Sequence, residues 1–444
     1  MRIDQVQVKG LFGRFDHHLK FATDENIMIM IGPNGFGKTT TLRLIDALFN
    51  RSVGRVAEVP FRQVEVTFDN GCALTAVKAE DVDQRKPDSP DVTLTLLSGR
   101  RSETFEHRRV SSDSLGVPIS AIEDAIPALR RVGRREWHNL ETGRVLDLEE
   151  VLAFHEDELA FFVRSGVSAV PEWLQELRNS VAVRFIDTER LTSAPNPRRN
   201  RRGVRADTPK RTVSQYSHKL ATQVGQSREE YVARSQSLER TFPARVVADN
   251  GAQNGSMDEL RSQLNDLERK RSRLEHAGLL AGEQFDIEVP ELTRVDESHR
   301  KLLTVFAQDA AEKLAVFDKL YDCVDAFTSI ANSRLRHKQV VVSAKGLGVA
   351  DSDGDSLDLE KLSSGEQHEL VILYELIFRT APDSLVLIDE PELSLHVAWQ
   401  AQFVPDLERM TKLTGFRAIL ATHSPDIIGD RWDLTVELHE PGTG

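Results

Sequence analysis

The sequence predicts an α/β fold: a head of mixed and parallel sheet, with flanking helices and a β-meander, is interrupted by a mostly helical insertion. Two observations indicate the head. Continuously apolar runs that suit buried parallel strands lie near both ends of the chain, and each is followed by a turn and a helical pattern. The long helical periodicity between them indicates the insertion. We expect the head in two parts, 1–113 and 337–444, with the insertion at 114–336.

The first part of the head opens with strand patterns around a glycine-rich turn. Residues 3–12 read as a strand, and 27–31 form a continuously apolar run. Apolar residues then recur at helical spacing over 39–49, so the turn lies between a strand and a helix. A β-meander follows at 62–71, 72–79 and 91–99, with Asp69-Asn70-Gly71 as a hairpin turn.

The insertion shows two features besides its helical pattern and one strand-like piece at 181–191. An Arg-rich loop at 194–211 lacks apolar periodicity, and it reads either as a solvated linker or as an arm that contacts phosphates. A short coiled coil at about 256–280 places leucines in heptad register, with Arg271 in one apolar slot. This pattern predicts a helical hairpin arm or a dimer contact.

The second part of the head repeats the alternation of strand and helix. Residues 338–344 have a strand pattern, and glycine-rich turns follow as far as Asp355. A helix with an apolar face is predicted within 362–378. Two buried strands are predicted at 385–388 and 416–421.

Composition excludes several classes of protein. With 57 Lys and Arg against 70 Asp and Glu, the net charge is −13, so a contact with nucleic acid requires a local basic patch. Two cysteines, Cys72 and Cys323, are too few for a disulfide framework and suit a reducing compartment. No apolar run approaches the roughly 20 residues of a membrane span. We therefore expect a cytoplasmic protein without membrane contact.

The turn after the first buried strand matches the phosphate-binding pattern G-x-x-x-x-G-K-[ST]. Glycines allow backbone N–H groups to curl around a triphosphate, and the helix start adds its positive end. We expect Lys38 to reach the β and γ phosphates of ATP and the Thr39 hydroxyl to hold Mg²⁺. An ordinary βα turn is the alternative. The predicted nucleotide-binding residues here are Gly32, Asn34, Gly35, Gly37, Lys38, Thr39 and Thr40.

Two carboxylates end the strand at 385–388. We expect Asp389 to bind the magnesium shell and Glu390 to orient or deprotonate the attacking water. The same pair could instead cap the helix that Pro391 begins.

Two further segments carry polar residues at element ends. Ser363, Ser364 and Gly365 precede a helix and suit an anion, although a capping box between Ser363 and Glu366 explains the same residues. His423 follows the strand at 416–421, where it could contact the γ-phosphate or have a structural role.

The four motifs occur in an order that resembles the ATP-binding-cassette (ABC-type) ATPases. "LSSGEQ", "DEPELSLH" and "ATHSP" resemble the branch that contains RecF, the SMC and Rad50 proteins and the OLD-type ATPases. The resemblance implies an ATPase whose site closes in a homodimer, with Ser363, Ser364 and Gly365 acting on the nucleotide of the other subunit. It implies that Ser394, Leu395 and His396 cross the dimer. It also places the basic residue Arg14 near the nucleotide.

Departures from that family limit the resemblance. No glutamine loop is identifiable beyond two weak candidates, Gln63 and the strand "FIDTERL" at 185–191, and no Cys-x-x-Cys marks a zinc hook. We expect no Toprim nuclease after His423, and therefore expect that any nuclease driven by ATP hydrolysis belongs to another chain.

The resemblance is greatest to the stand-alone ATPases of the PARIS (AriA) and Septu (PtuA) anti-phage systems. It implies a slow, regulatory ATPase that forms a larger homo-oligomer and holds an effector nuclease until a phage protein or nucleic acid signals. A RecF-like repair clamp is the alternative, in which the Arg-rich loop grips duplex DNA. We call residues 363–366 the signature turn. A transporter cassette fits poorly because this turn reads Ser-Ser-Gly-Glu and the insertion is too large.

Overall fold

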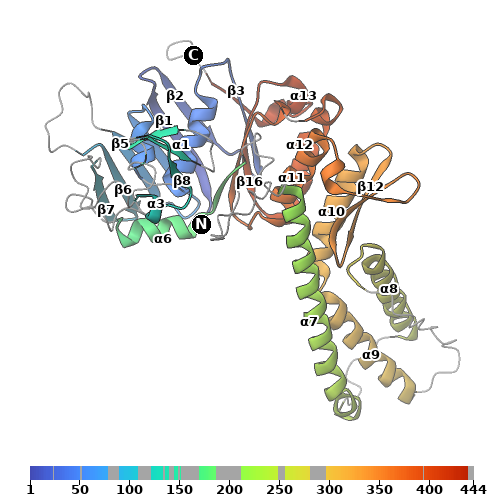
Figure 1. Cartoon of the computed structure of the whole chain (residues 1–444). Coiled ribbons are helices and arrows are strands. Elements are labelled where there is room, and N and C mark those ends of the chain that lie inside the picture. Colours follow the sequence, from blue (N-terminus) through green and yellow to red (C-terminus); the bar gives the residue numbers. More distant parts are fainter. Residues whose placement is uncertain are drawn as a thin grey trace. The chain divides into compact units, whose positions relative to one another are not determined.

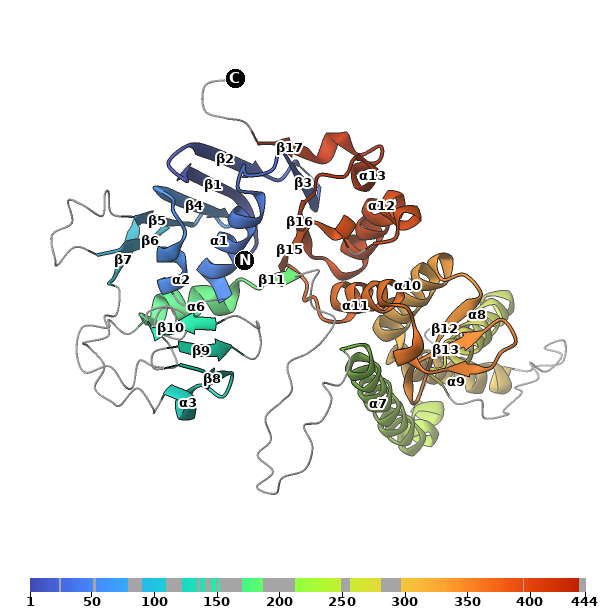
Figure 2. The ribbon, with the colours of Figure 1, turned by 45° about the horizontal axis from the view of Figure 1, so that its top comes forward.

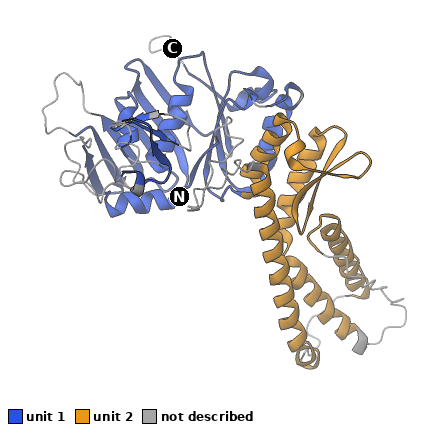
Figure 3. Ribbon diagram, viewed as in Figure 1, with its two compact units in different colours: residues 1–210, 379–444 blue, residues 211–378 orange. Residues whose placement is uncertain are grey.

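The computed structural model divides the chain into two compact units (Figure 3). Unit 1 comprises residues 1–210 and 379–444, and unit 2 comprises residues 211–378. The structure describes residues 1–23, 25–50, 53–78, 90–108, 122–133, 136–139, 145–148, 151, 170–186, 212–248, 256–280, 297–393 and 395–438.

A parallel sheet forms the centre of unit 1 (Figure 1). Its strand order is β11-β15-β16-β3-β17, and every neighbouring pair is parallel. The three inner strands are almost wholly buried, as expected of a parallel sheet covered on both faces. The strands are β3 (Ile27–Ile31), β11 (Val183–Ile186), β15 (Leu385–Asp389), β16 (Arg417–Ala421) and β17 (Thr435–Glu437).

A second, antiparallel sheet forms a six-stranded meander in unit 1, in the order β2-β1-β4-β5-β6-β7 (Figure 2). Alternate residues of these strands are buried, so only one face of the sheet joins the core. The strands are β1 (Ile3–Leu11), β2 (Phe15–Lys20), β4 (Gln63–Phe68), β5 (Ala73–Lys78), β6 (Val92–Ser98) and β7 (Arg101–His107).

Helix α1 (Lys38–Asn50) joins the two sheets, because its apolar residues belong to one core with both of them. Leu44 and Leu48 of this helix are fully buried in a cluster that includes Val64 of the meander and Leu387 of the central sheet. The short helix α2 (Val53–Glu58) follows it. The start of α1, and with it the phosphate loop, is thereby fixed next to the carboxyl ends of the strands of the central sheet.

The segment after the meander differs from the helical pattern predicted for it. A small antiparallel sheet, in the order β10-β9-β8, carries the fully buried Trp137 on its middle strand. Its strands are three or four residues long, too short for their periodicity to be recognised in the sequence. These elements are α3 (Ile122–Ala125), β8 (Leu129–Arg131), β9 (Glu136–Asn139), β10 (Val145–Asp147) and the following helix α6 (Glu172–Ser180).

Unit 2 is built from long helices and a three-stranded sheet, β12-β13-β14. The helix α7 lies beside α9, and α8 also packs on α9 (Figure 1). The elements are α7 (Thr212–Ala248), α8 (Met257–His276), α9 (Glu297–Ala315), α10 (Asp318–Arg334), β12 (Lys338–Ser343), β13 (Gly346–Asp351), β14 (Ser356–Leu357), the 3₁₀ turn η6 (Leu359–Lys361) and α11 (Ser364–Phe378).

The predicted coiled-coil segment corresponds to α8. Its Leu260 and Leu264 bury against Ala307 of α9, so this leucine stripe packs within the chain. Gly278, just after α8, has a φ of 69°, and an added Cβ would lie 1.9 Å from the carbonyl oxygen of Val342. Only glycine permits this close approach of α8 to β12.

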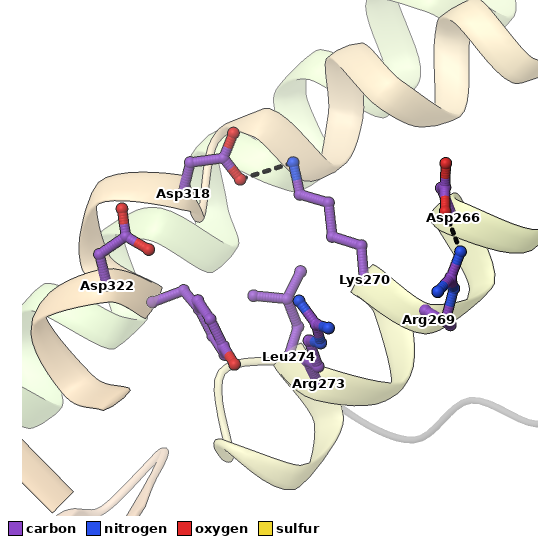
Figure 4. Close-up of a pocket in the computed structure, with 8 residues that line it drawn as sticks. Asp266, Arg269, Lys270, Arg273, Leu274, Asp318 and Asp322 are labelled. Carbon is purple, nitrogen blue, oxygen red and sulfur yellow. Dashed lines mark hydrogen bonds and ion pairs between the residues drawn. The ribbon is translucent and has the colours of Figure 1, made fainter. Parts of the chain in front are cut away.

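A groove of about 320 Å³ lies between α8 and α10 (Figure 4). Three basic and three acidic residues line it, and Lys270 pairs with Asp318 at 2.5 Å while Arg269 pairs with Asp266. Since these opposite charges already compensate one another, the groove does not select a ligand of one charge.

The compact units divide the chain at other positions than the predicted boundaries of 113 and 336. Residues 114–210 cluster with the head, and residues 337–378, which include the signature turn, cluster with the helical unit. Among the described residues, no helix combines the length and apolarity that a membrane crossing requires.

Candidate active site

The phosphate loop connects β3 to α1, as the sequence predicts. Gly35 and Gly37 have φ values of 86° and 83°, a region that disfavours residues with a Cβ. An added Cβ at Gly37 would also lie 2.5 Å from Leu11 Cδ2, whereas Gly35 has open space there. Glycine is therefore required at Gly37 for two reasons, backbone conformation and close packing.

Residues at and beside the turn between β1 and β2 pack against the phosphate loop. Phe15, the first residue of β2, packs against Phe36 of the loop with their rings tilted by 32° and their centroids 5.0 Å apart. Arg14 is exposed in this turn. Phe12, in the same turn, lies 3.3 Å from the position that a Cβ on Gly37 would occupy. The structure thus places Arg14 on a turn that packs against the phosphate loop.

A buried histidine, which the sequence analysis did not select, holds the first turn of α1. His17 Nδ1 lies 3.0 Å from Thr41 Oγ1, and the Thr41 hydroxyl donates to the carbonyl oxygen of Gly37 at 2.9 Å. Burial lowers the pKa of His17 to about 4, against the opposing effects of Asp16 and the Phe36 backbone. His17 is therefore neutral at pH 7. The alternation of buried residues along β2 could have indicated its inward position.

Lys38, the first residue of α1, extends its side chain back over the phosphate loop. Its ammonium donates to the carbonyl oxygens of Gly32 at 2.8 Å and Pro33 at 3.2 Å, and it contacts His423 Nε2. Burial lowers the pKa of Lys38, while the carboxylates that follow β15 favour its charged form. A cation held by carbonyl oxygens in this way is suited to an anionic ligand.

The end of β15 meets the start of α1 beside this ammonium. The Thr39 hydroxyl donates to Asp389 Oδ1 at 3.1 Å, and Glu390 Oε1 lies 3.8 Å from His423 Nε2. Glu390 has a φ of 43°, a strained conformation for a residue with a side chain, and strain of this kind concentrates at functional sites. The structure thus brings together the predicted residues Lys38, Thr39, Asp389, Glu390 and His423.

A third carboxylate, Glu392, was not selected from the sequence. It lies in the 3₁₀ turn η7 (Pro391–Leu393), and its Oε1 accepts hydrogen bonds from the Thr422 hydroxyl at 2.7 Å and the His423 N–H at 2.9 Å. The sequence shows no periodic signal for this contact, because it joins two loops that are thirty residues apart.

The signature turn lies in unit 2. Ser363 and Glu366 form a reciprocal capping box: the Glu366 N–H donates to Ser363 Oγ at 3.3 Å, and the Ser363 N–H donates to Glu366 Oε2 at 2.8 Å. Burial raises the pKa of Glu366, but hydrogen bonds from Lys338 and Ser363 outweigh this effect and hold the pKa below its usual value. A Cβ on Gly365 would meet no atom within 4 Å. The capping box, which explains Ser363 and Glu366 without a ligand, is therefore formed. The surface around Gly365 is open.

The remaining residues predicted from the sequence differ in how far they are exposed to solvent. Asn34 is exposed and Thr40 half-buried, while Leu395 is buried and His396 exposed. The weak glutamine-loop candidate Gln63 lies half-buried at the start of β4. Ser394 and the Arg-rich loop at 194–211 lie outside the described residues. Within the described part of the chain, no group of three or more His, Cys, Asp and Glu side chains is arranged to hold a metal ion.

These residues define a P-loop ATPase site on a parallel α/β sheet. Residues 172–429 match the family described as "AAA domain, putative AbiEii toxin, Type IV TA system". Because this match covers more than half of the chain, the chain belongs to that family of AAA ATPases. The matched region begins after the phosphate loop and contains the signature turn, β15 and His423.

The chain is also similar to "Retron Ec83 probable ATPase" of Escherichia coli, with 28% identity over 138 residues. The alignment spans 29% of this chain and 23% of that relative.

A comparison with solved structures matches an Smc head domain with an extended coiled coil bound to the C-terminal domain of ScpA from Pyrococcus furiosus. It has 12% identity and a TM-score of 0.34, and covers 99% of this chain and 96% of that chain. The SMC head domain from Thermotoga maritima has 10% identity and a TM-score of 0.33, and covers 97% of this chain and 93% of that chain.

Proposed function

We propose that this chain is a slow, nucleotide-gated ATPase that acts as an oligomeric sensor in prokaryotic anti-phage defence and controls an effector nuclease in another chain. The observation that carries the nucleotide site is the convergence of Lys38, Thr39, Asp389, Glu390 and His423 at the ends of β3, β15 and β16. The defence role is supported by the toxin–antitoxin description of the family and by the retron relative.

The residues divide the chemistry among them. The loop N–H groups and Lys38 would bind the phosphates, and Glu390 would orient or deprotonate the attacking water. His423, between Lys38 and Glu390, would contact the γ-phosphate. Thr39 and Asp389 present hard oxygen atoms side by side, which fits Mg²⁺, and these two residues would hold it. When bound, Mg²⁺ would neutralise charge on the phosphates.

The dimer forms part of the same proposal. Ser363, Ser364 and Gly365 would contact the nucleotide bound by the other subunit, so that ATP closes a homodimer, and further contacts would build a larger homo-oligomer. The open surface at Gly365 supports this role. A phage protein or nucleic acid would serve as the trigger for the effector.

Two substitutions test the site. Lys38→Ala removes the central cation and should abolish ATP binding. Glu390→Gln keeps the shape of the side chain but removes the base, so kcat should fall about 10²- to 10⁴-fold while ATP stays bound. Turnover and ATP affinity of the purified chain are the measurements. Normal turnover by Glu390→Gln would reject its role as the base.

The alternative function is a RecF-like clamp on duplex DNA, which the Arg-rich loop at 194–211 favours. Titration of the same preparations with duplex DNA at several salt concentrations distinguishes the two functions. A steep loss of affinity with salt, abolished when the loop arginines are changed to Ala, supports the clamp. The arginines concerned are Arg198, Arg199, Arg201 and Arg202.

A further inference from the structure

Glu392 joins two loops that border the candidate active site. The loop after β15 carries Glu390 and Glu392, and the loop after β16 carries Thr422 and His423. Both polar groups at the start of the second loop, the Thr422 hydroxyl and the His423 N–H, donate to the same oxygen of Glu392, at 2.7 Å and 2.9 Å. Thr422 is fully buried. A carboxylate that accepts two such bonds fixes the backbone from which the His423 side chain projects.

The same contact is supported from the other side by α12 (Val397–Thr414). The buried Gln400 of this helix donates its amide to the backbone oxygens of Glu392 and Leu395, each at 3.3 Å. The Ser424 hydroxyl donates to the Gln400 amide oxygen at 3.1 Å. Glu392 and the residue after His423 are therefore held by one side chain, and this fixes the spacing between the two loops.

The position of His423 depends on this arrangement. Its ring contacts the Lys38 ammonium and lies 3.8 Å from Glu390 Oε1, so a small rotation of its loop would separate these groups. Thr39 and Asp389, by contrast, bond directly to each other at 3.1 Å. Loss of Glu392 should thus disturb His423 and leave the phosphate loop in place.

We propose that Glu392 is a positioning residue for ATP hydrolysis, which holds His423 against Lys38 and Glu390 and thereby sets kcat rather than the affinity for ATP. This inference rests on the proposed role of His423 at the γ-phosphate. It adds a third carboxylate to the two at the end of β15, with a role different from those proposed for Asp389 and Glu390.

The experiment compares Glu392→Ala, His423→Ala and the double variant in the full chain, with ATP turnover and binding of a fluorescent ATP analogue as readouts. We expect kcat of Glu392→Ala to fall about 10- to 100-fold, with analogue affinity within about twofold of the wild type. Because Glu392 acts through His423, the double variant should be no slower than His423→Ala. Asp426→Asn, at an exposed carboxylate after His423, is the matched control and should keep normal turnover.

A second, milder variant tests the inference if Glu392→Ala does not fold. Thr422→Val keeps the carboxylate and the His423 N–H bond but removes the hydroxyl, which donates to Glu392 and accepts from the Ser424 N–H, so it should lower kcat less than Glu392→Ala does. Normal kcat in a folded Glu392→Ala, or in Thr422→Val if Glu392→Ala does not fold, overturns the inference. Rate losses that multiply in the double variant also overturn it. A wild-type chain that binds no analogue instead rejects the proposed site as a whole.

Discussion

At the scale of single residues, the phosphate loop depends on glycines with different requirements. Gly35 and Gly37 share a positive φ, so replacing either by Ala costs about 1 kcal/mol in backbone conformation. Only at Gly37 does the new Cβ also overlap the buried Leu11 side chain, which adds about 1–3 kcal/mol.

We therefore expect Gly37→Ala to lower the free energy of unfolding and to weaken ATP binding more than Gly35→Ala does. Urea unfolding and binding of an ATP analogue measure both effects. Equal losses in the two variants would show that the contact between Gly37 and Leu11 does not constrain the loop.

Buried histidines make the stability of the chain depend on pH. Burial lowers the pKa of His17 and of His368 from 6.5 to about 4, and the same holds for His107, where Asp91 opposes the shift. The unfolded chain then binds more protons between pH 4 and 6.5 than the folded chain. Stability from these groups is complete above pH 6.5 and is lost as the pH falls towards 4.

His17→Gln should accordingly reduce the loss of unfolding free energy between pH 7 and pH 5. Urea unfolding at both pH values measures that difference. The exposed His18 on the same strand supplies the control, since His18→Gln removes no buried imidazole. An unchanged pH dependence in His17→Gln would mean that this ring is not held neutral by burial.

At the scale of elements, a buried ion pair fixes α11 to α10. Arg334 and Glu369 contact each other with side-chain exposures of 4% and 1%. Removing one partner leaves a buried charge uncompensated, which typically costs about 3–5 kcal/mol, whereas replacing both with apolar residues costs much less.

Glu369→Met should thus be strongly destabilising, and Arg334→Met combined with Glu369→Met should recover most of the loss. Thermal and urea unfolding of the two variants supply the comparison. A double variant as unstable as the single one would indicate that the pair contributes more than charge compensation.

Elements with long periodic patterns could be predicted from the sequence, and short or long-range ones could not. The P-loop strand and helix and the leucine stripe of α8 are local signals, and the structure confirms these elements. The strands of the sheet around Trp137 are too short to show a period. The bonds of Glu392 and His17 join segments that are far apart in the sequence and meet only in the fold, so the sequence alone could not reveal them.

At the scale of the whole molecule, the predicted site needs two copies of the chain. The phosphate loop belongs to unit 1 and the signature turn to unit 2, and the proposal pairs each loop with the signature of the partner subunit. This arrangement can be tested by mixing two inactive variants, one defective in each element.

Lys38→Ala keeps an intact signature, and Ser364→Arg keeps an intact phosphate loop. In an equal mixture half of the dimers are mixed, and each has one complete site, so activity should recover to about a quarter of the wild-type value. ATP turnover before and after mixing is the measurement, with each variant alone as the control. If mixing restores no activity although mixed dimers form, the signature does not act on the nucleotide of the partner.

The strand order of the central sheet also has a consequence for synthesis of the protein. Within the described part of the chain, β3 pairs with β16 and β17, which are synthesised more than 380 residues after it. At about 5–20 residues per second, the ribosome releases these partners roughly 20–80 s after β3. During that time an apolar strand stays unpaired, and it needs shelter from the meander or from chaperones. A chain that terminates before β16 lacks both His423 and the strand that pairs with β3, so we expect it not to hydrolyse ATP.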